Sequence, residues 1–304
     1  MFYLAVCCKK ASFLFGKQMK VDIIVATHNR PGLLKETLKS VTAQTYSHWT
    51  CWIAEDGETA ATFEAIKLFL QDDRFIYLPG EHTGFPAAPR NRTICMGTAR
   101  YVAILDDDDL WLPEKLEKQV AFLDSHPDCV LLGCNAFRWP GTGSWRKCPL
   151  YFKKNVLGKI RYAGMLEQNY VIHSSAILRR ASLDQAGLYN ETLNPPIGED
   201  YELWLRMGVL GEIWALPEPH MVLRQTPPTY YSTMDRPKKY QTMANIFESA
   251  LSGAGEIPSP LSLPENRYFA AACRHERDFY RAGPRFLGRF RHEMSKKIKR
   301  LCDY

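Results

Sequence analysis

Short apolar runs alternate with amphipathic segments over the first half of the chain. Apolar runs rich in β-branched and aromatic residues predict strands at 21–26, 49–54, 74–79, 101–105 and 129–133. Between them, apolar residues spaced three or four positions apart predict helices at 31–44, 62–71, 89–99 and 113–126. Repeated strand–helix units of this kind predict a doubly wound α/β fold, with a mostly parallel sheet covered by helices on both faces.

The pattern after residue 134 is less regular. A strand that passes into a turn is predicted within 171–190, and a helix within 198–211. Two further helices are predicted at 236–253 and 266–282, joined by a Pro-containing linker. We therefore expect a loose extension at 1–19, a main domain at 20–230 with a boundary between two halves near residue 134, and a helical, basic extension at 231–304.

Polar residues follow three of the predicted strands at their carboxyl ends. Ligands of open α/β sheets bind beyond those ends, so the three clusters should meet at one edge. The clusters are Thr27, His28 and Asn29 after the first strand, Glu55, Asp56 and Gly57 after the second, and Asp106 to Asp109 after the fourth.

The run of four aspartates is unusual because like charges repel. Two carboxylates about 4 Å apart repel by roughly 4 kcal/mol near a protein surface. Oxygen-rich clusters of this kind suit hard divalent ions such as Mg²⁺ or Mn²⁺. In an extended stretch Asp106 and Asp108 would point the same way. The alternative is an acidic loop that caps the helix starting near Pro113, which would account for Asp109 but does not call for four aspartates.

A second acidic group, Glu199 and Asp200, stands at the start of the helix predicted within 198–211. Carboxylates at a helix N-terminus are stabilised by the helix dipole. Asp200 can be interpreted as a general base, or both residues as a helix cap, and the local pattern alone favours the cap.

Four motifs in order give the chain a resemblance to a known family. The segments VDIIVATHNRPGLLKETLKSVTAQTY, AEDGE, AAPRNRTICMGTARYVAILDDDDLWLPEKLEKQV and SSAILRR…AGLYNETL…GEDYELWLRM resemble the inverting, nucleotide-sugar-dependent glycosyltransferases of GT-A family 2. The likeness spans about residues 20–206. It implies a GT-A fold with a Rossmann-like nucleotide-binding half at 20–134 and an acceptor half at 135–230.

The resemblance also implies roles for single residues. Asp200 would be the catalytic base, and Asp108 would hold Mg²⁺ or Mn²⁺ against the donor diphosphate. Within this assignment Asp56 would contact the base, Arg90 the diphosphate, and Asp106 the ribose or sugar. The full set implied to bind the nucleotide sugar is Thr27, His28, Asn29, Arg30, Asp56, Arg90, Asp106 and Asp107, with Asp109, Glu199 and Trp111 as secondary candidates.

Two features of the resemblance leave alternatives open. The register of the metal ligands within Asp106 to Asp109 can be read in more than one way. The family often has Arg-x-His after the acceptor segment, whereas this chain has Arg224 and Thr226, so a histidine ligand there is not expected.

Composition and charge narrow the setting. The chain has 304 residues and a formal net charge of +6, and the basic excess lies mainly at 281–300, which would suit an anionic lipid surface, nucleic acid, or a solvated helix face. No apolar run reaches about 18 residues, so an integral membrane enzyme is not expected. The nine cysteines show no paired C-x-x-C spacing, which favours core thiols in a reducing compartment. Six scattered histidines are interpreted as surface or core residues: His82, His126, His173, His220, His275 and His292.

These observations favour a cytoplasmic, hexosyltransferase-type enzyme. It would transfer a sugar from a nucleotide-diphosphate donor to a glycan or glycolipid acceptor in lipopolysaccharide, capsule or exopolysaccharide assembly. Its basic C-terminus is a candidate for peripheral contact with the inner membrane face, and nucleic acid is not an expected partner. The alternatives are a sugar-phosphate nucleotidyltransferase and a non-catalytic carbohydrate- or nucleic-acid-binding protein.

Overall fold

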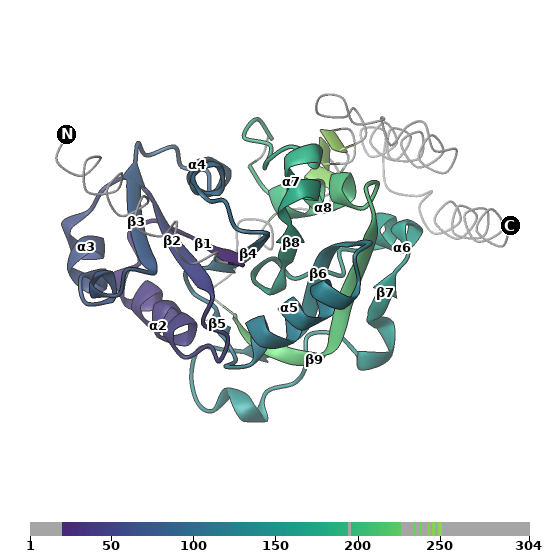
Figure 1. The fold of residues 1–304 in the computed structure, drawn as a ribbon, viewed down its shortest axis with the longest axis horizontal. Helices are drawn as coiled ribbons and strands as arrows, with labels where there is room; N and C mark the ends of the chain where they lie inside the picture. The colour runs from purple at the N-terminus through teal and green to yellow at the C-terminus, as the bar shows by residue number, and fades with distance from the viewer. Residues whose placement is uncertain are drawn as a thin grey trace, which may run out of the picture.

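The computed structural model describes residues 20–193 and 196–225, together with 234, 238, 242–243, 245–246 and 249–250. The predicted extensions at 1–19 and, apart from those single positions, at 231–304 lie outside the described residues. In the described part the strands form one mixed sheet in the order β3-β2-β1-β4-β8-β6-β9-β5, with β7 paired to β9 (Figure 1).

The strands and helices of the first half follow the predicted order. The strands are β1 (Val21–Thr27), β2 (Trp49–Asp56), β3 (Phe75–Gly80), β4 (Tyr101–Asp106), β5 (Leu110–Trp111) and β6 (Cys129–Trp139). The helices are α2 (Pro31–Thr42), α3 (Ala60–Ile66), α4 (Ala87–Met96) and α5 (Lys115–Ser125). The five predicted strands and four predicted helices of this half are confirmed, although the helix predicted at 62–71 ends at Ile66 and a 3-10 turn follows at Phe69–Gln71.

The second half contains shorter elements and one long strand. They are β7 (Gly158–Ile160), α6 (Tyr162–Glu167), a 3-10 turn at His173–Ser175, β8 (Ile177–Arg179), α7 (Arg180–Ala186), α8 (Glu199–Met207) and β9 (Glu212–Arg224). The sheet is continuous across both halves because β8 pairs antiparallel with β4 on one side and with β6 on the other.

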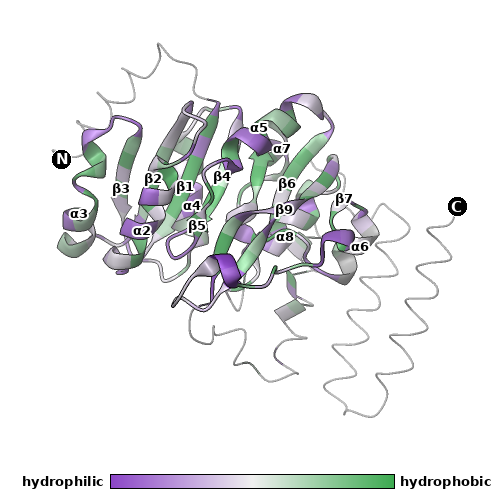
Figure 2. Ribbon diagram, turned by 90° about the horizontal axis from the view of Figure 1, so that it is seen from below, coloured by the Kyte–Doolittle hydropathy of each residue, from purple (hydrophilic) through white to green (hydrophobic). Residues whose placement is uncertain are grey.

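Helices cover both faces of the sheet, as predicted for a doubly wound fold. Alternate residues of β1 face opposite sides: Ile23 packs with Leu34 and Leu38 of α2, whereas Ile24 packs with Ile94 of α4. Helices α2, α3 and α5 contribute to the hydrophobic cluster that contains Ile23, and helices α4, α7 and α8 contribute to the cluster that contains Ile24. The strands are mostly hydrophobic (Figure 2), because the sheet is buried on both faces.

The pairing register brings the carboxyl ends of three strands together. Strand β1 lies between β2 and β4 and is parallel to both, with Thr27 opposite Glu55 and Ala26 opposite Asp106. The polar residues that follow these strands therefore lie at one edge of the sheet, as predicted. In the part of the chain that the structure describes, we find no helix long and apolar enough to span a bilayer.

Candidate active site

Asp106, the last residue of β4, is held by three side chains. Its carboxylate accepts hydrogen bonds from Arg90 Nη2 at 2.7 Å and from Ser174 Oγ at 3.2 Å, and lies 3.0 Å from His173 Nδ1. Burial favours the neutral acid, but the charges of His173 and Arg90 outweigh it and lower the pKa of Asp106. Asp106 is therefore ionised and fixed in position by the protein.

Asp107 and Asp108 form a turn beyond the strand, so the alternation expected of an extended chain stops at Asp106. Asp107 accepts a hydrogen bond of 2.6 Å from Thr27 Oγ1, and Arg30 Nη1 lies 3.2 Å from Asp107 and 3.3 Å from Asp108. Burial and the charges of its neighbouring aspartates raise the pKa of Asp108 to about 6. The exposed Arg30 thus leaves excess negative charge at this turn.

Asp109 and Trp111 lie behind the cavity rather than in it. The carboxylate of Asp109 is buried and accepts a 2.8 Å hydrogen bond from the backbone N–H of Arg224 in β9. The buried indole of Trp111 donates to the backbone carbonyl of Ser174 at 2.7 Å, and the ammonium group of Lys115 lies 3.9 Å from its ring centroid. Both residues connect the aspartate turn to the surrounding framework.

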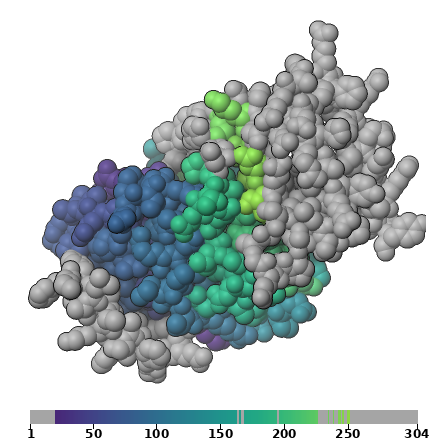
Figure 3. Space-filling model, turned by 90° about the horizontal axis from the view of Figure 1, so that it is seen from above, coloured from purple at the N-terminus to yellow at the C-terminus, as the bar shows by residue number. Residues whose placement is uncertain are grey.

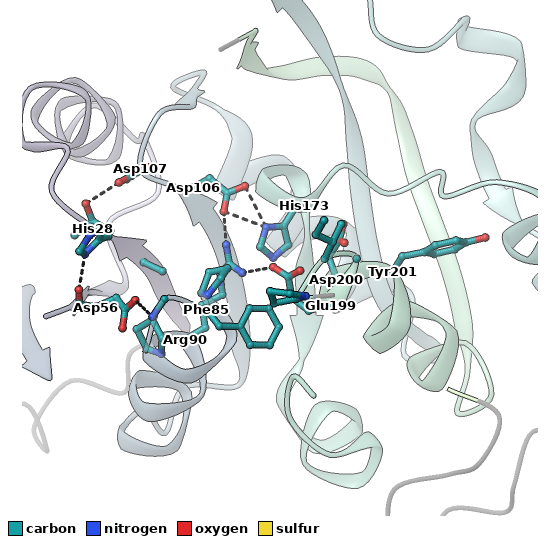
Figure 4. A pocket seen from close by; sticks show the side chains of 18 of the residues that line it. His28, Asp56, Phe85, Arg90, Asp106, Asp107, His173, Glu199, Asp200 and Tyr201 are labelled. Carbon is teal, nitrogen blue, oxygen red and sulfur yellow. Dashed lines mark hydrogen bonds and ion pairs between the residues drawn. The ribbon is translucent and has the colours of Figure 1, made fainter. Parts of the chain in front are cut away.

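Arg90 joins the aspartate run to the start of α8. Its guanidinium is buried between Asp106 and Glu199, each at 2.7 Å (Figure 4). Asp106 and Glu199 come from opposite halves of the sequence, so one side chain from α4 connects the two sides of the cavity.

Asp200 faces the cavity from the first turn of α8. Gly198 precedes this turn with a left-handed φ of +78°, and a Cβ at this position would lie 2.4 Å from Ile246 Cδ1. The carboxylate of Asp200 accepts a hydrogen bond of 3.3 Å from Asn169 Nδ2. Burial, with the charges of Glu199 and Asp106, raises the pKa of Asp200, although His173 acts in the opposite direction. A raised pKa makes this carboxylate a stronger proton acceptor.

At the far end of the cavity, Asp56 terminates β2. It accepts hydrogen bonds from Thr83 N at 2.6 Å, Thr83 Oγ1 at 2.8 Å and Gly84 N at 2.8 Å. Burial opposes ionisation, but these bonds and the nearby His82 lower the pKa of Asp56. The imidazole rings of His28 and His82 stack beside it, with centroids 4.3 Å apart.

One cavity of about 960 Å³ connects these groups. Figure 3 shows the blue first half and the green second half side by side on the face seen from above. The predicted residues that line the cavity are Thr27, His28, Arg30, Asp56, Arg90, Asp106, Asp107, Asp108, Glu199 and Asp200. Asn29 is not among the lining residues; it is exposed, with φ of 51°.

The cavity wall also contains residues that the sequence did not single out: His82, Phe85, Asn169, His173 and Tyr201. His82 and His173, interpreted from the sequence as surface or core histidines, both line the cavity. His82 follows β3 at the same sheet edge, so the strand-end rule already contained the signal for it. No comparable signal marked His173, which lies just before the antiparallel strand β8.

Comparison with known proteins identifies the family. Residues 22–187, more than half of the 304-residue chain, match the model of glycosyl transferase family 2. The chain belongs to glycosyltransferase family 2. The family 2 assignment makes this protein a transferase enzyme, as predicted from its motifs.

Curated relatives of this family 2 chain are distant. An uncharacterized glycosyltransferase of Rickettsia conorii is 28% identical over 245 residues, which are 77% of this chain but 37% of that protein. The Escherichia coli UDP-Glc:alpha-D-GlcNAc-diphosphoundecaprenol beta-1,3-glucosyltransferase WfaP is 27% identical over 62% of this chain and 69% of its own. The Erwinia amylovora amylovoran biosynthesis glycosyltransferase AmsE is 28% identical over 67% and 75%, respectively. The chain spans between about a third and two thirds of the length of the first relatives it matches.

Solved structures confirm the GT-A fold for this family 2 chain. Staphylococcus aureus TarS 1–349 in complex with UDP has a TM-score of 0.64 at 19% identity, covering 84% of this chain and 71% of that one. The mannosyltransferase PcManGT of Pyrobaculum calidifontis in complex with GDP-Man and Mn²⁺ has a TM-score of 0.59 at 16% identity, covering 97% and 87%.

Proposed function

We propose that this enzyme is an inverting glycosyltransferase that transfers a hexose-type sugar from a nucleotide-diphosphate donor to an acceptor hydroxyl. The observation that carries the proposal is the shared cavity, in which the aspartates after β4 face Asp200 at the start of α8. Residues 20–134 would bind the donor and residues 135–230 the acceptor.

The donor would lie along the edge of the sheet with its base at Asp56. Thr27 at the end of β1, with His28 and Arg30 in the loop that follows, lines the cavity, and Asn29 of this loop would also contribute to binding of the nucleotide sugar. The complexes of TarS with UDP and of PcManGT with GDP-Man support a nucleotide sugar as co-substrate.

The aspartate turn fits a hard divalent cation. The groups available to bind an ion there are carboxylate oxygens. The raised pKa of Asp108 indicates that Arg30 compensates only part of the negative charge at the turn. Asp108 would hold Mg²⁺ or Mn²⁺, with Asp107 beside it. When bound, the cation stabilises negative charge on the leaving diphosphate. The Mn²⁺ in the PcManGT complex supports this assignment.

Asp200 would act as the general base. Its raised pKa favours removal of the acceptor hydroxyl proton as the oxygen attacks the anomeric carbon. Attack from the side opposite the departing diphosphate inverts the anomeric centre, and the proton passes from the hydroxyl to the Asp200 carboxylate. Asp106, fixed by Arg90 and His173, would contact the ribose or sugar between these two groups.

The acceptor is proposed to be a glycan or glycolipid in cell-surface polysaccharide assembly, as the names of WfaP and AmsE suggest. The proposal includes a cytoplasmic location at the inner face of a membrane. Its support is the basic excess at 281–300, which lies outside the described residues.

A donor screen tests the function. The purified chain is heated with nucleotide diphosphates and nucleotide sugars, with and without Mn²⁺, and one donor should raise the melting temperature more when Mn²⁺ is present. NMR of the product made with that donor should show an anomeric configuration opposite to that of the donor. Retention of configuration would refute the inverting mechanism, and a lack of stabilisation by every nucleotide would refute donor binding.

A further inference from the structure

Two histidines and one aspartate converge in the wall of the cavity. His28, Asp56 and His82 come from three different strand-end segments, and one potential ligand atom from each lies within 4.8 Å of the other two. His82 Nδ1 lies 3.1 Å from Asp56 Oδ2, and these two groups form an ion pair when the histidine is protonated. Zinc ligands at bond lengths of about 2.1 Å in a tetrahedral site are about 3.4 Å apart.

The carboxylate of this cluster is already oriented by neighbouring groups. Thr83 and Gly84 donate three hydrogen bonds to Asp56, which fix the side chain and stabilise its charged form. Such supporting hydrogen bonds are a usual feature of metal sites, where they orient the ligands.

The tautomer of His28 also suits metal binding. Its Nδ1 lies 2.6 Å from the backbone carbonyl oxygen of Asp56. A carbonyl oxygen only accepts, so Nδ1 carries the proton and Nε2 keeps its lone pair. Ligating histidines generally donate their other ring N–H to a carbonyl or carboxylate in this way.

The chemistry of this cluster differs from that of the aspartate turn. Imidazole nitrogen suits Zn²⁺, Ni²⁺ and Cu²⁺, whereas carboxylate oxygen alone suits Mg²⁺ and Mn²⁺. The side chain of His82 is 55% exposed, so an ion can reach the cluster from solvent.

We propose that His28, Asp56 and His82 form a second metal site, for a late first-row divalent ion such as Zn²⁺, and that the bound ion closes the base-binding end of the cavity. The ion would take the Asp56 carboxylate that the nucleotide base otherwise contacts. Zn²⁺ and the nucleotide therefore compete; this second part rests on the proposed function, whereas the metal site does not.

Direct titration tests the site. The untagged full chain is titrated with Zn²⁺ by calorimetry and with Co²⁺ by visible absorption. His82→Gln should weaken the tightest Zn²⁺ binding at least about 10-fold and remove the corresponding Co²⁺ band. His48→Gln is the matched control, because His48 is an exposed histidine that directly precedes β2, whereas Asp56 ends it. His28→Gln should weaken Zn²⁺ binding in the same way as His82→Gln. The melting temperatures of both variants without metal should equal that of the wild type, which shows that both fold.

Equal Zn²⁺ affinity and stoichiometry in wild type, His82→Gln and His28→Gln would overturn the metal site. Repeating the titration with saturating UDP separates the two ideas. A weaker Zn²⁺ affinity, after correction for the Zn²⁺ that free UDP binds in a titration without protein, supports competition, and an unchanged corrected affinity with bound UDP overturns it while donor binding stands. If no nucleotide binds the zinc-free chain, the proposed function and competition fail, and the His82→Gln result still decides the metal site.

Discussion

Replacing Arg90 by methionine removes the side chain that links Asp106 to Glu199. Arg90 is 6% exposed, and its guanidinium has carboxylates at 2.7 Å on two sides. Breaking a buried ion pair by removing one partner costs about 3–5 kcal/mol, because the remaining charge is buried without compensation. Asp106 keeps His173 and Ser174, so we expect the lower end, about 3 kcal/mol, which shifts the melting temperature by about 6–12 °C.

Urea unfolding at pH 7.5, followed by tryptophan fluorescence, measures this cost. The double variant Arg90→Met/Glu199→Gln should recover part of the stability, because it also removes the charge left beside the methionine. Arg100→Met is the control: Arg100 pairs with Asp124 at 3.3 Å but its side chain is 55% exposed, so the loss should be within about 1 kcal/mol. An equally small loss for Arg90→Met would refute the reasoning.

The same variant should change the response to acid. The folded-state pKa of Asp106 is lowered by His173 and Arg90, so its contribution to stability is present above the unfolded pKa near 3.9 and is lost as the pH falls below it. Arg90→Met removes one cause of the lowered pKa. Its stability should therefore fall less steeply below pH 4 than that of the wild type.

Further predictions concern the base, the metal and one buried lysine. Asp200→Asn should still be stabilised by UDP but transfer about 10²- to 10⁴-fold more slowly, with the exposed Asp184→Asn as control; transfer at the wild-type rate would exclude Asp200 as base. The acidic limb of the pH profile of kcat/KM should have an apparent pKa above 3.8, the ordinary aspartate value, because activity rises as Asp200 ionises. Asp108→Asn should abolish the Mn²⁺-dependent part of nucleotide stabilisation. Burial lowers the pKa of Lys115 to about 8, so the folded state loses this proton at a lower pH than the unfolded state. The free energy of unfolding of the wild type should therefore rise by about 3 kcal/mol between pH 8 and 10.5. The melting temperature of Lys115→Met should lack this rise.

Most of the fold could be predicted from the sequence because the first half is locally consistent. Apolar runs such as 101–105 become strands buried on both faces, and the intervening periodic segments become the helices that cover them. Strand β9 was not predicted, since Pro217 and Pro219 lie inside it. Proline cannot donate to a strand ladder, and here the register of β9 against β6 is irregular at Asn135, where Pro219 is opposite.

The strand-end rule also predicted many of the residues that line the cavity. It located Thr27, His28, Asp56 and the aspartates, because parallel strands bring the residues at their carboxyl ends to one edge of the sheet. It could not locate Asn169 or His173, which reach the cavity through an irregular segment and tertiary packing. Contacts between residues more than 60 positions apart, such as that of His173 with Asp106, leave no periodic pattern in the sequence.

The four consecutive aspartates show why roles within a motif need the structure. Asp109 is buried against the Arg224 backbone and Asp107 is bonded to Thr27, so each has a protein partner. Asp106 contacts Arg90 and His173, which lower its pKa, so its negative charge is already compensated by the protein. The pKa values of Asp107, Asp108 and Asp109 are all raised, mainly by burial, and the cationic partner of Asp108 among the described residues is the exposed Arg30. A divalent cation would therefore gain most from Asp108, which favours that carboxylate as the metal ligand and Asp106 as the fixed contact to the donor.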